Sequence, residues 1–434
     1  MKNKFYLFFI IISFLMSFEG DMHDFYLPNG LKVIIYEKHT HPTVALNVVY
    51  DIGSHDDPIG KKGLAHVMAN LMFEGSKNYK KHEHNSLISS TGGSSSFTHW
   101  QMIDYLEFSS VTTVDHFELL LKLESDRLFS LLINSETVTN AINSAISTIK
   151  EEMESSFWEV EKALLSIYPN NHPYSYSRLG NIENLEKISI DDCQQAYDKY
   201  FTPNNAILTI VGDIDPLKKL EIINKYFGGS KLSTSLPKNP NLSLEQRNNN
   251  DEISMFYPNN WPMNSYLQAY SMPIQRNEDF LILDFITTVL RMKSSPYNKF
   301  VSSSDNFTRG LIFVKQRLGN GFFAFVLESE SGVEDDLKKH EEAIENFVTN
   351  LKNNGIESSF FKAAIKKQKL SLLINNYDSK WTARNLGRHE IYQGDYKTYF
   401  DNTRLYEKFT NEDIKRVAKK YFINDYKLGI TDSD

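Results

Sequence analysis

Hydrophobic and polar residues follow two different periods along the chain, and these periods predict a mixture of strands and helices. Two β-rich runs within residues 24–36 flank the turn sequence Pro28-Asn29-Gly30, a combination typical of a β-hairpin. Two further strands are predicted at residues 44–50 and 206–213, the second with the apolar run of a buried strand. Apolar residues at helical spacing predict helices at residues 64–73, 114–132 and 137–155.

A similar order of elements begins again after a polar connector. Residues 228–251 contain paired glycines, two prolines and a run of three asparagines, a composition typical of a linker. The residues beyond it predict a strand at 266–272, a helix at 278–290, strands at 311–314 and 322–327, and helices at 333–351 and 358–375. Two halves of comparable length and similar element order favour a duplicated α+β domain. We assign residues 21–230 to the first domain, 231–252 to the linker and 253–434 to the second domain.

The first twenty residues have the features of a secretory signal peptide. Lys2 and Lys4 precede an apolar run at residues 5–18, which is too short for a membrane span of about 20 residues. Small residues near position 20 would permit cleavage, and an uncleaved N-terminal anchor is the alternative. We therefore predict a signal peptide at residues 1–20, a mature chain without a membrane span, and export to a bacterial periplasm.

Composition and charge narrow the possible functions. The chain has 434 residues, of which 41% are hydrophobic, enough to form two substantial cores. Its formal net charge of −8 argues against nucleic acid as a partner, because such a surface needs clustered lysines and arginines. Cys193 is the only cysteine, so an intramolecular disulfide is impossible and the fold must be stabilised by its core.

Several short motifs follow one another in an order that resembles a known family. Residues 63–70 read G-L-A-H-V-M-A-N, and residues 71–76 continue with L-M-F-E-G-S. Further fragments that carry the resemblance lie at residues 50–54, 123–128, 172–174, 201–206 and 295–299. Together they resemble the pitrilysin/insulinase family of inverted-motif (H-x-x-E-H) zinc metallopeptidases, in its two-domain form. The resemblance implies two homologous domains of the metallopeptidase LuxS/processing-peptidase type, each a mixed, mostly antiparallel β-sheet flanked by α-helices.

The resemblance also assigns roles to positions of the motif helix, and two of these positions have lost the required residue. In the family, two histidines four residues apart bind zinc from one helix face, and a glutamate between them is the general base. His66 matches the first ligand, but Ala69 replaces the general base and Asn70 replaces the second histidine. A glutamate on a later helix completes the zinc shell in the family. Glu152 is the better match to it, because Glu151 lies on the opposite side of the apolar stripe.

This replacement pattern predicts a pseudoenzyme. A neutral amide is a poor zinc donor, and alanine accepts no proton, so we expect no catalytic residue and no cofactor. His66, Asn70 and Glu152 are then degenerate remnants that bind Zn²⁺ only if the altered site still holds metal. The second half also lacks the substrate-contacting pair of the family, since Phe313 stands at its Tyr and Asn306 near its Arg.

Two neighbouring segments offer other candidate sites. The Gly-rich segment at residues 92–98 resembles the family's peptide-pairing edge strand, which makes Ser95, Ser96, Phe97 and Thr98 the candidates for peptide binding. The H-x-H pair at residues 82–84 would need a third fixed ligand, such as His99, to bind metal. We interpret residues 80–85 as a solvated, charged stretch and residues 86–96 as a flexible loop.

Three functions from different classes remain open. The first, which we favour, is a non-catalytic envelope subunit that pairs with an active zinc-peptidase relative, or with a second copy, to form a peptide-binding chamber. The second is a stand-alone envelope scaffold or peptide-binding protein. The third is a zinc endopeptidase with an atypical metal shell, drawn from His66, Glu152 and a distant residue. It requires a new general base as well as a new ligand.

Overall fold

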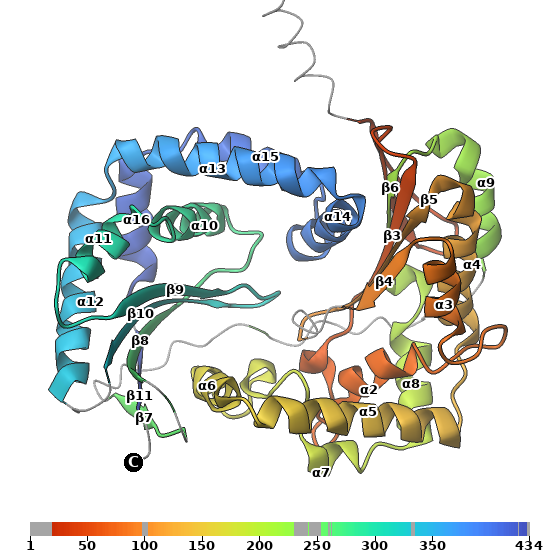
Figure 1. The fold of residues 1–434 in the computed structure, drawn as a ribbon, viewed down its shortest axis with the longest axis horizontal. Helices are drawn as coiled ribbons and strands as arrows, with labels where there is room; N and C mark the ends of the chain where they lie inside the picture. The colour runs from red at the N-terminus through yellow and green to blue at the C-terminus, as the bar shows by residue number, and fades with distance from the viewer. Residues whose placement is uncertain are drawn as a thin grey trace, which may run out of the picture.

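The computed structural model of the protein describes residues 20–97, 103–229, 242, 253–258, 261, 263–330, 335–423 and 425–431. The predicted signal peptide except Gly20, the predicted linker except Leu242, and Thr98 lie outside these residues. The strands form two β-sheets on opposite sides of the molecule, with helices around and between them (Figure 1).

The first sheet has six strands in the order β1-β2-β6-β3-β5-β4. The strands β1 (Met22–Tyr26) and β2 (Lys32–Glu37) form the predicted hairpin. β2 pairs in parallel with β6 (Ala206–Gly212), whereas the pairs formed by β3 (Thr43–Tyr50) with β6 and with β5 (Leu106–Thr113) are antiparallel. The short strand β4 (Ser94–Phe97) pairs only with β5 and is therefore an edge of this sheet.

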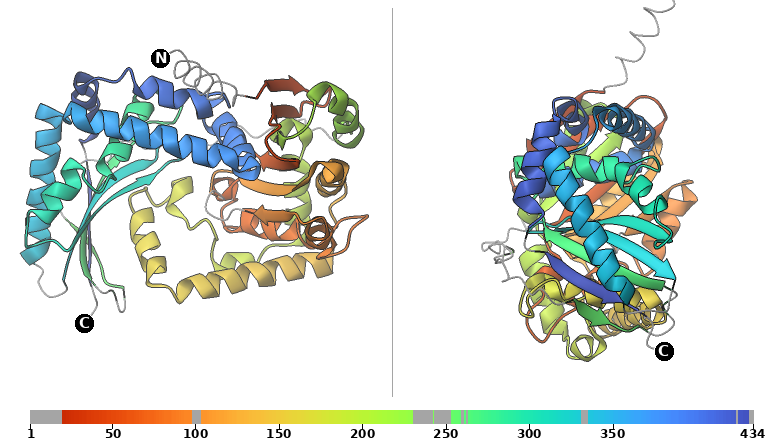
Figure 2. Two further views of the ribbon diagram at one scale, coloured as in Figure 1. Left: turned by 45° about the horizontal axis from the view of Figure 1, so that its top comes forward. Right: turned by 90° about the vertical axis from the view of Figure 1, so that its left-hand side faces the viewer.

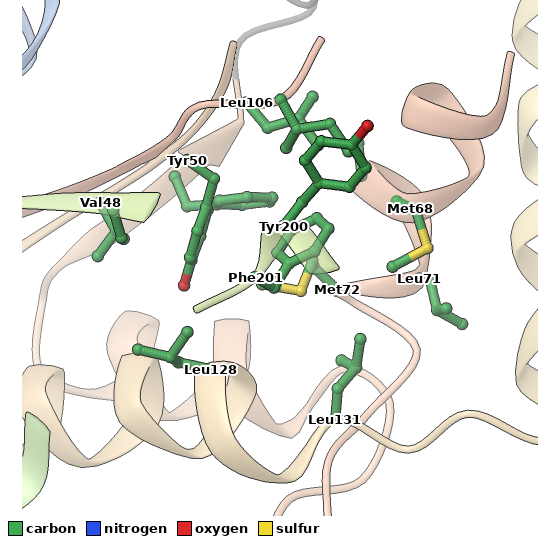
Figure 3. Packing of buried hydrophobic residues seen from close by; sticks show 14 of the residues in the cluster. Val48, Tyr50, Met68, Leu71, Met72, Leu106, Leu128, Leu131, Tyr200 and Phe201 are labelled. Carbon is green, nitrogen blue, oxygen red and sulfur yellow. The ribbon is translucent and has the colours of Figure 1, made fainter. Parts of the chain in front are cut away.

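The first half contains eight helices within the described residues. In chain order they are α2 (Leu64–Leu71), α3 (Glu83–Ser90), α4 (Phe117–Ser130), α5 (Ser135–Met153), α6 (Ser156–Leu165), α7 (Ile182–Leu185), α8 (Ile190–Tyr200) and α9 (Pro216–Phe227). Short 3₁₀ turns lie at Ser54–Asp56, Val114–His116, Pro173–Ser175 and Pro203–Asn205. Of the eight helices, α3 and α4 pack on one face of this sheet. Figure 3 shows part of the hydrophobic core of this half, in which Tyr50 of β3 packs beside Phe201 and the cluster extends to Leu128 of α4 and Met68 of α2.

The second sheet has five strands in the order β7-β11-β8-β10-β9. Its strands are β7 (Ser254–Phe256), β8 (Met263–Ser271), β9 (Arg309–Lys315), β10 (Phe322–Glu330) and β11 (Tyr426–Ile430). Only the pair β7–β11 is parallel. The accompanying helices are α10 (Glu278–Leu290), α11 (Pro296–Ser302), α12 (Asp335–Asn354), α13 (Ser358–Tyr377), α14 (Ser379–Gln393), α15 (Thr398–Tyr406) and α16 (Asn411–Tyr421). Two mixed, mostly antiparallel sheets flanked by helices confirm the predicted α+β fold class.

Each half places a helix on the sheet of the other half. Helix α14 crosses from the second half and packs on β3 and β6, as the two views of Figure 2 show. Its approach is close, because a Cβ atom on Gly387 would lie 3.0 Å from Cγ2 of Val49. In return, α6 and the segment after it pack on the second sheet, where Val160 and Leu164 join a cluster with Leu267 and Phe322. The two halves are therefore interlocked rather than merely adjacent.

The predicted elements named above agree with the structure to within three residues at most boundaries, but residues 86–96 do not. The prediction of a loop at residues 86–96 is wrong, since residues 83–90 form α3 and residues 94–97 form β4, whereas residues 80–85 are exposed as predicted except for His84. His84 and Ile88 lie one turn apart and both are buried, which gives a polar segment one packed face.

The membrane prediction concerns the mature chain. Within the described ranges, no helix combines the length and apolar character that a membrane crossing requires.

Candidate functional site

The helix α2 carries the degenerate motif and is held at its start by a buried carboxylate. Asp57 accepts hydrogen bonds from the backbone N–H groups of Gly63 at 2.7 Å and Ala65 at 2.8 Å. Gly63 has a φ of +106°, and a Cβ there would lie 2.5 Å from Cδ2 of Leu185. Glycine is thus required for the chain to enter this helix. Burial raises the pKa of Asp57 to about 7, although the two backbone donors oppose this shift.

The motif positions on α2 point into the protein. His66 is fully buried, and its Nδ1 lies 3.3 Å from the carbonyl oxygen of Leu179. Ala69 is also fully buried and packs in the main core of the first half. Its methyl group offers no proton acceptor where the resemblance implies a general base, so this helix cannot activate a water molecule in the way the family does.

Asn70 faces α5 and contacts Ser144 there. The side-chain amide of Asn70 donates to the carbonyl oxygen of His66 at 3.1 Å, and its oxygen accepts a hydrogen bond from the Ser144 hydroxyl at 3.4 Å. The structure therefore brings a neutral amide and a neutral hydroxyl together between the two helices.

Glu152, the residue predicted to match the distal ligand, lies elsewhere on the same helix. It is eight residues beyond Ser144, about 12 Å along the helix axis. Its carboxylate is 3.2 Å from the guanidinium of Arg178, which also binds both oxygens of Glu161 at 2.8 Å. The structure thus places Ser144, not Glu152, opposite Asn70. Positions 144, 148 and 152 share one helix face, so helical periodicity alone does not distinguish them. The sequence signal against Glu152 is its long separation from Asn70.

These donors do not fit a catalytic zinc ion. Across the residues with described positions, no group of three or more His, Cys, Asp or Glu side chains is placed to hold a metal ion. The side chains in contact between α2 and α5 are one amide and one hydroxyl, and the imidazole of His66 contacts the carbonyl oxygen of Leu179, whereas catalytic zinc sites use three ligands drawn from imidazole, thiolate and carboxylate.

A cleft of about 490 Å³ opens beside Asn70 and Ser144. Its walls come from α2, α3, α5, the segment that follows α2, and the edge strand β4, and include Phe73, Glu74, Lys81, His82, His84, Asn85, Ser95 and Ser96. The predicted peptide-binding residues Ser95 and Ser96 therefore line the cleft. Phe97 belongs to the same strand but not to this lining, and Thr98 lies outside the described residues.

A buried ion pair lies beneath this cleft, and the sequence analysis assigned it no role. Glu124 on α4 pairs with Arg127, and its carboxylate is 3.4 Å from Nε2 of His84. Burial acts to raise the pKa of Glu124, but the attraction of Arg127 and His84 outweighs it and lowers the pKa to about 2. Burial and the charge of Arg127 lower the pKa of His84, while Glu124 opposes this shift.

In the second half, apolar packing occupies the position where the resemblance places the family's substrate-contacting tyrosine. Phe313 lies on β9, with its ring centroid 5.9 Å from that of Phe322, and Asn306 is exposed in the loop before this strand. Neither residue lines the cleft beside α2.

Comparison with known proteins agrees with this architecture. Residues 32–181 match the family described as insulinase (peptidase family M16), and residues 187–368 match the peptidase M16 inactive domain. The zinc protease PqqE of Helicobacter pylori is 22% identical over 409 residues, which cover 91% of this chain and 89% of that protein. A crystal structure of a protease from Helicobacter pylori superposes with a TM-score of 0.85 at 19% identity, over 95% of this chain and 99% of that chain. The first half of the periplasmic protease PqqL from Escherichia coli gives a TM-score of 0.74 at 15% identity, over 95% of this chain and 92% of that chain. On these matches and this fold, the chain belongs to the insulinase family, peptidase family M16.

Proposed function

We propose that this chain is a non-catalytic member of its family, which binds peptides and pairs with an active zinc-containing relative in the bacterial cell envelope. The observation that carries the proposal is the set Ala69, Asn70 and Ser144, which supplies no general base and no charged zinc ligand next to His66. Loss of a general base alone removes about 10²–10⁴ in rate. The rest of the scaffold is retained, and retention of the fold without the reacting groups supports a binding role.

The edge strand and the cleft support peptide binding. An extended peptide adds to a sheet by hydrogen bonding to an edge strand, with side-chain pockets beside it. β4 is such an edge, and Ser95 and Ser96 on it line a cleft large enough for several side chains. Because the cleft meets the degenerate motif at Asn70, a bound peptide would cross the position of the missing chemistry without being cut.

Comparison with PqqL supports pairing. This chain aligns with 92% of the first half of PqqL and with 48% of the whole of that protein. We propose that the unit formed by the present residues pairs with a second unit of the same kind, carried by a relative with an intact motif or by a second copy.

The proposed location combines two observations. The apolar run at residues 5–18 has the length of a secretory segment, and PqqL is described as periplasmic. Both support export of this chain to the bacterial periplasm.

A stepwise restoration of the motif tests the loss of catalysis. Wild-type protein is expected to contain no stoichiometric zinc and to leave unstructured peptides intact. The double variant Asn70→His/Ser144→Glu should bind zinc together with His66, and addition of Ala69→Glu should then produce chelator-sensitive hydrolysis. The matched control is Asn70→His/Ser147→Glu, because Ser147 lies on the same helix but its hydroxyl donates to Glu151 and not to Asn70. Stoichiometric zinc in the wild type, or hydrolysis abolished by His66→Ala, would contradict the proposal.

Pairing is tested separately, with the full chain purified from its native cell. Size measurement and mass spectrometry should find a family relative with an intact H-x-x-E-H motif in equal amount. Recovery of monomer alone would contradict the pairing and favour the stand-alone envelope scaffold or peptide-binding protein.

A further inference from the structure

A second cavity, of about 300 Å³, lies in the second half between α10, the end of β9 and α14. Four of its lining residues are cations, namely Arg291, Lys315, Arg317 and Arg388, and one is a carboxylate, Asp284. It shares no lining residue with the cleft beside α2. Such an excess of positive charge around one small cavity needs an explanation, because like charges repel one another.

The fold brings these cations together from three separate elements. Asp284, Thr287 and Arg291 lie three and four residues apart on and just after α10, so they share one face of that helix. Arg388 and Tyr392 lie four residues apart on α14, and Lys315 and Arg317 follow one another at the end of β9. The convergence depends on α14, which is held between the two sheets by its packing on β3 and β6.

The three guanidinium groups are held by neutral partners. Nε of Arg291 donates to the carbonyl oxygen of Ile312 at 3.0 Å, and Nη2 of Arg388 donates to the amide oxygen of Gln316 at 2.5 Å. Among the residues whose positions are described, no carboxylate forms an ion pair within 4.0 Å of either group or of Arg317. For Arg317, which is buried, the lack of a direct counter-ion is costly.

The nearby carboxylates have other hydrogen-bond partners. Asp284 accepts hydrogen bonds from the hydroxyl of Tyr406 and, at 3.4 Å, from the amide of Gln316. Asp104 accepts hydrogen bonds from the hydroxyls of Tyr174 at 2.7 Å and Tyr392 at 2.8 Å, and from the backbone N–H of Leu318 at 3.3 Å. Both carboxylates offset part of the positive charge, and Glu107 and Glu161, which pair with Arg384 and Arg178, add to this effect.

Arg317 is buried beside Lys315 and acts on it. Arg317 is only 7% exposed, its guanidinium lies 5.5 Å from the ring centroid of Tyr174, and its Nε has no hydrogen-bond partner among the described residues. Burial and the charge of Arg317 lower the pKa of Lys315 to about 8. An anion in the cavity would accept a hydrogen bond from Nε of Arg317 and would raise the pKa of Lys315.

We propose that this cavity is a binding site for a small anion that carries a phosphate or carboxylate group. Arginine side chains present paired N–H donors that match the oxygens of either group, and such charge-assisted hydrogen bonds are about twice as strong as neutral ones. A cavity of about 300 Å³ accommodates the anionic group and a few attached atoms, not a long chain. The source is either a free small anion or the C-terminal carboxylate of a peptide, and the experiment distinguishes the two.

The first measurement is the thermal unfolding of the full chain in inorganic phosphate, with ionic strength held constant by sodium chloride. The midpoint of wild-type protein should rise and saturate with phosphate, because a ligand that binds the folded state stabilises it. The substitutions Arg291→Gln and Arg388→Gln should each weaken phosphate binding by about tenfold or more. Arg404→Gln is the matched control, since Arg404 is an exposed arginine on α15 that lies outside the cavity.

The second measurement identifies the source of the anion by competition with phosphate. Trialanine with a free carboxylate should compete if the site takes a peptide C-terminus, while trialanine amide should not. If neither peptide competes but phosphate binds, the site takes a free small anion.

Two results would overturn the proposal: no effect of phosphate beyond that of chloride, or an equal effect on wild type and both cavity variants. Arg291 is exposed at the rim, so its variant should keep the wild-type circular dichroism spectrum and remain informative if Arg388→Gln fails to fold. The outcome does not depend on zinc content or pairing, so failure here and failure of the proposed function are distinguishable.

Discussion

The replacement Arg127→Met should destabilise the first half strongly, because it removes the partner of a buried carboxylate. The side chain of Glu124 is 2% exposed and that of Arg127 is 4% exposed, so water cannot replace the lost guanidinium. Breaking one partner of a buried pair costs about 3–5 kcal/mol. The pKa of Glu124 points in the same direction, because the attraction of Arg127 and His84 more than offsets the effect of burial.

The same pair predicts a pH dependence of stability. The pKa of Glu124 is lower in the folded protein than in the unfolded chain, so its contribution to folding is fully present above about pH 4.5. It is lost as the pH falls from about 4.5 towards 2. In Arg127→Met the carboxylate has lost its main attraction, and this part of the acid sensitivity should shrink or reverse.

Urea denaturation at pH 7 and at pH 3.5, followed by circular dichroism, measures both effects. The matched control is Glu124→Gln, which removes the charge but keeps the shape of the side chain. In a double-mutant cycle, Glu124→Gln/Arg127→Met should cost less than the sum of the two single changes, because the unpaired carboxylate is absent. A cost below about 1 kcal/mol for Arg127→Met at pH 7, or strict additivity in the cycle, would refute the reasoning.

Three further predictions concern the motif helix and the junction of the halves. Gly63→Ala should lower the thermal midpoint by several degrees, since an added Cβ meets Leu185 at 2.5 Å in a backbone conformation with φ of +106°; an unchanged midpoint would contradict this. The pKa of Asp57, raised to about 7, is higher in the folded protein than in the unfolded chain, so its carboxylate costs stability as the pH rises from about 4 to about 7. Asp57→Asn should therefore gain stability relative to wild type across that range in urea titrations, whereas a constant difference would be inconsistent with the shift. Asp104→Leu should cost about 3 kcal/mol or more because three hydrogen-bond donors lose their acceptor, while Asp104→Asn should cost less; equal costs in denaturation would argue against a polar role.

The spacing of hydrophobic residues predicted most of the helices and strands named in the sequence analysis. It did not identify which residues meet at the candidate site. The apolar spacing located α2 and α5, yet Ser144, Thr148 and Glu152 repeat every four residues and present the same face. Only the packing of the two helices shows that Ser144 meets Asn70. The helix α3 was missed because its buried face consists of His84 and Ile88 within a run of polar residues. In both cases the deciding information is a contact between segments distant in the sequence.

The cationic cavity illustrates the same limit. Arg291, Lys315 and Arg388 are unremarkable as sequence positions, since each lies in an element that also carries ordinary surface charges. Their proximity results from the crossing of α14 between the sheets, which no local pattern predicts. The resemblance supplied the fold as a whole, but it could not supply a site built from residues that lie outside the motifs that carry it.

The reciprocal crossing of α14 and α6 bears on how readily the two halves separate. A rotation of one half away from the other would expose Ala383 and Leu386 of α14 and the face of the first sheet that they cover. It would also separate α6 from the apolar residues of the second sheet. Both sets of apolar contacts would be lost together, because the same relative movement of the halves separates both helices from the sheets they cover. Separation of the two halves within one chain is therefore unfavourable, because it would expose both apolar surfaces at once.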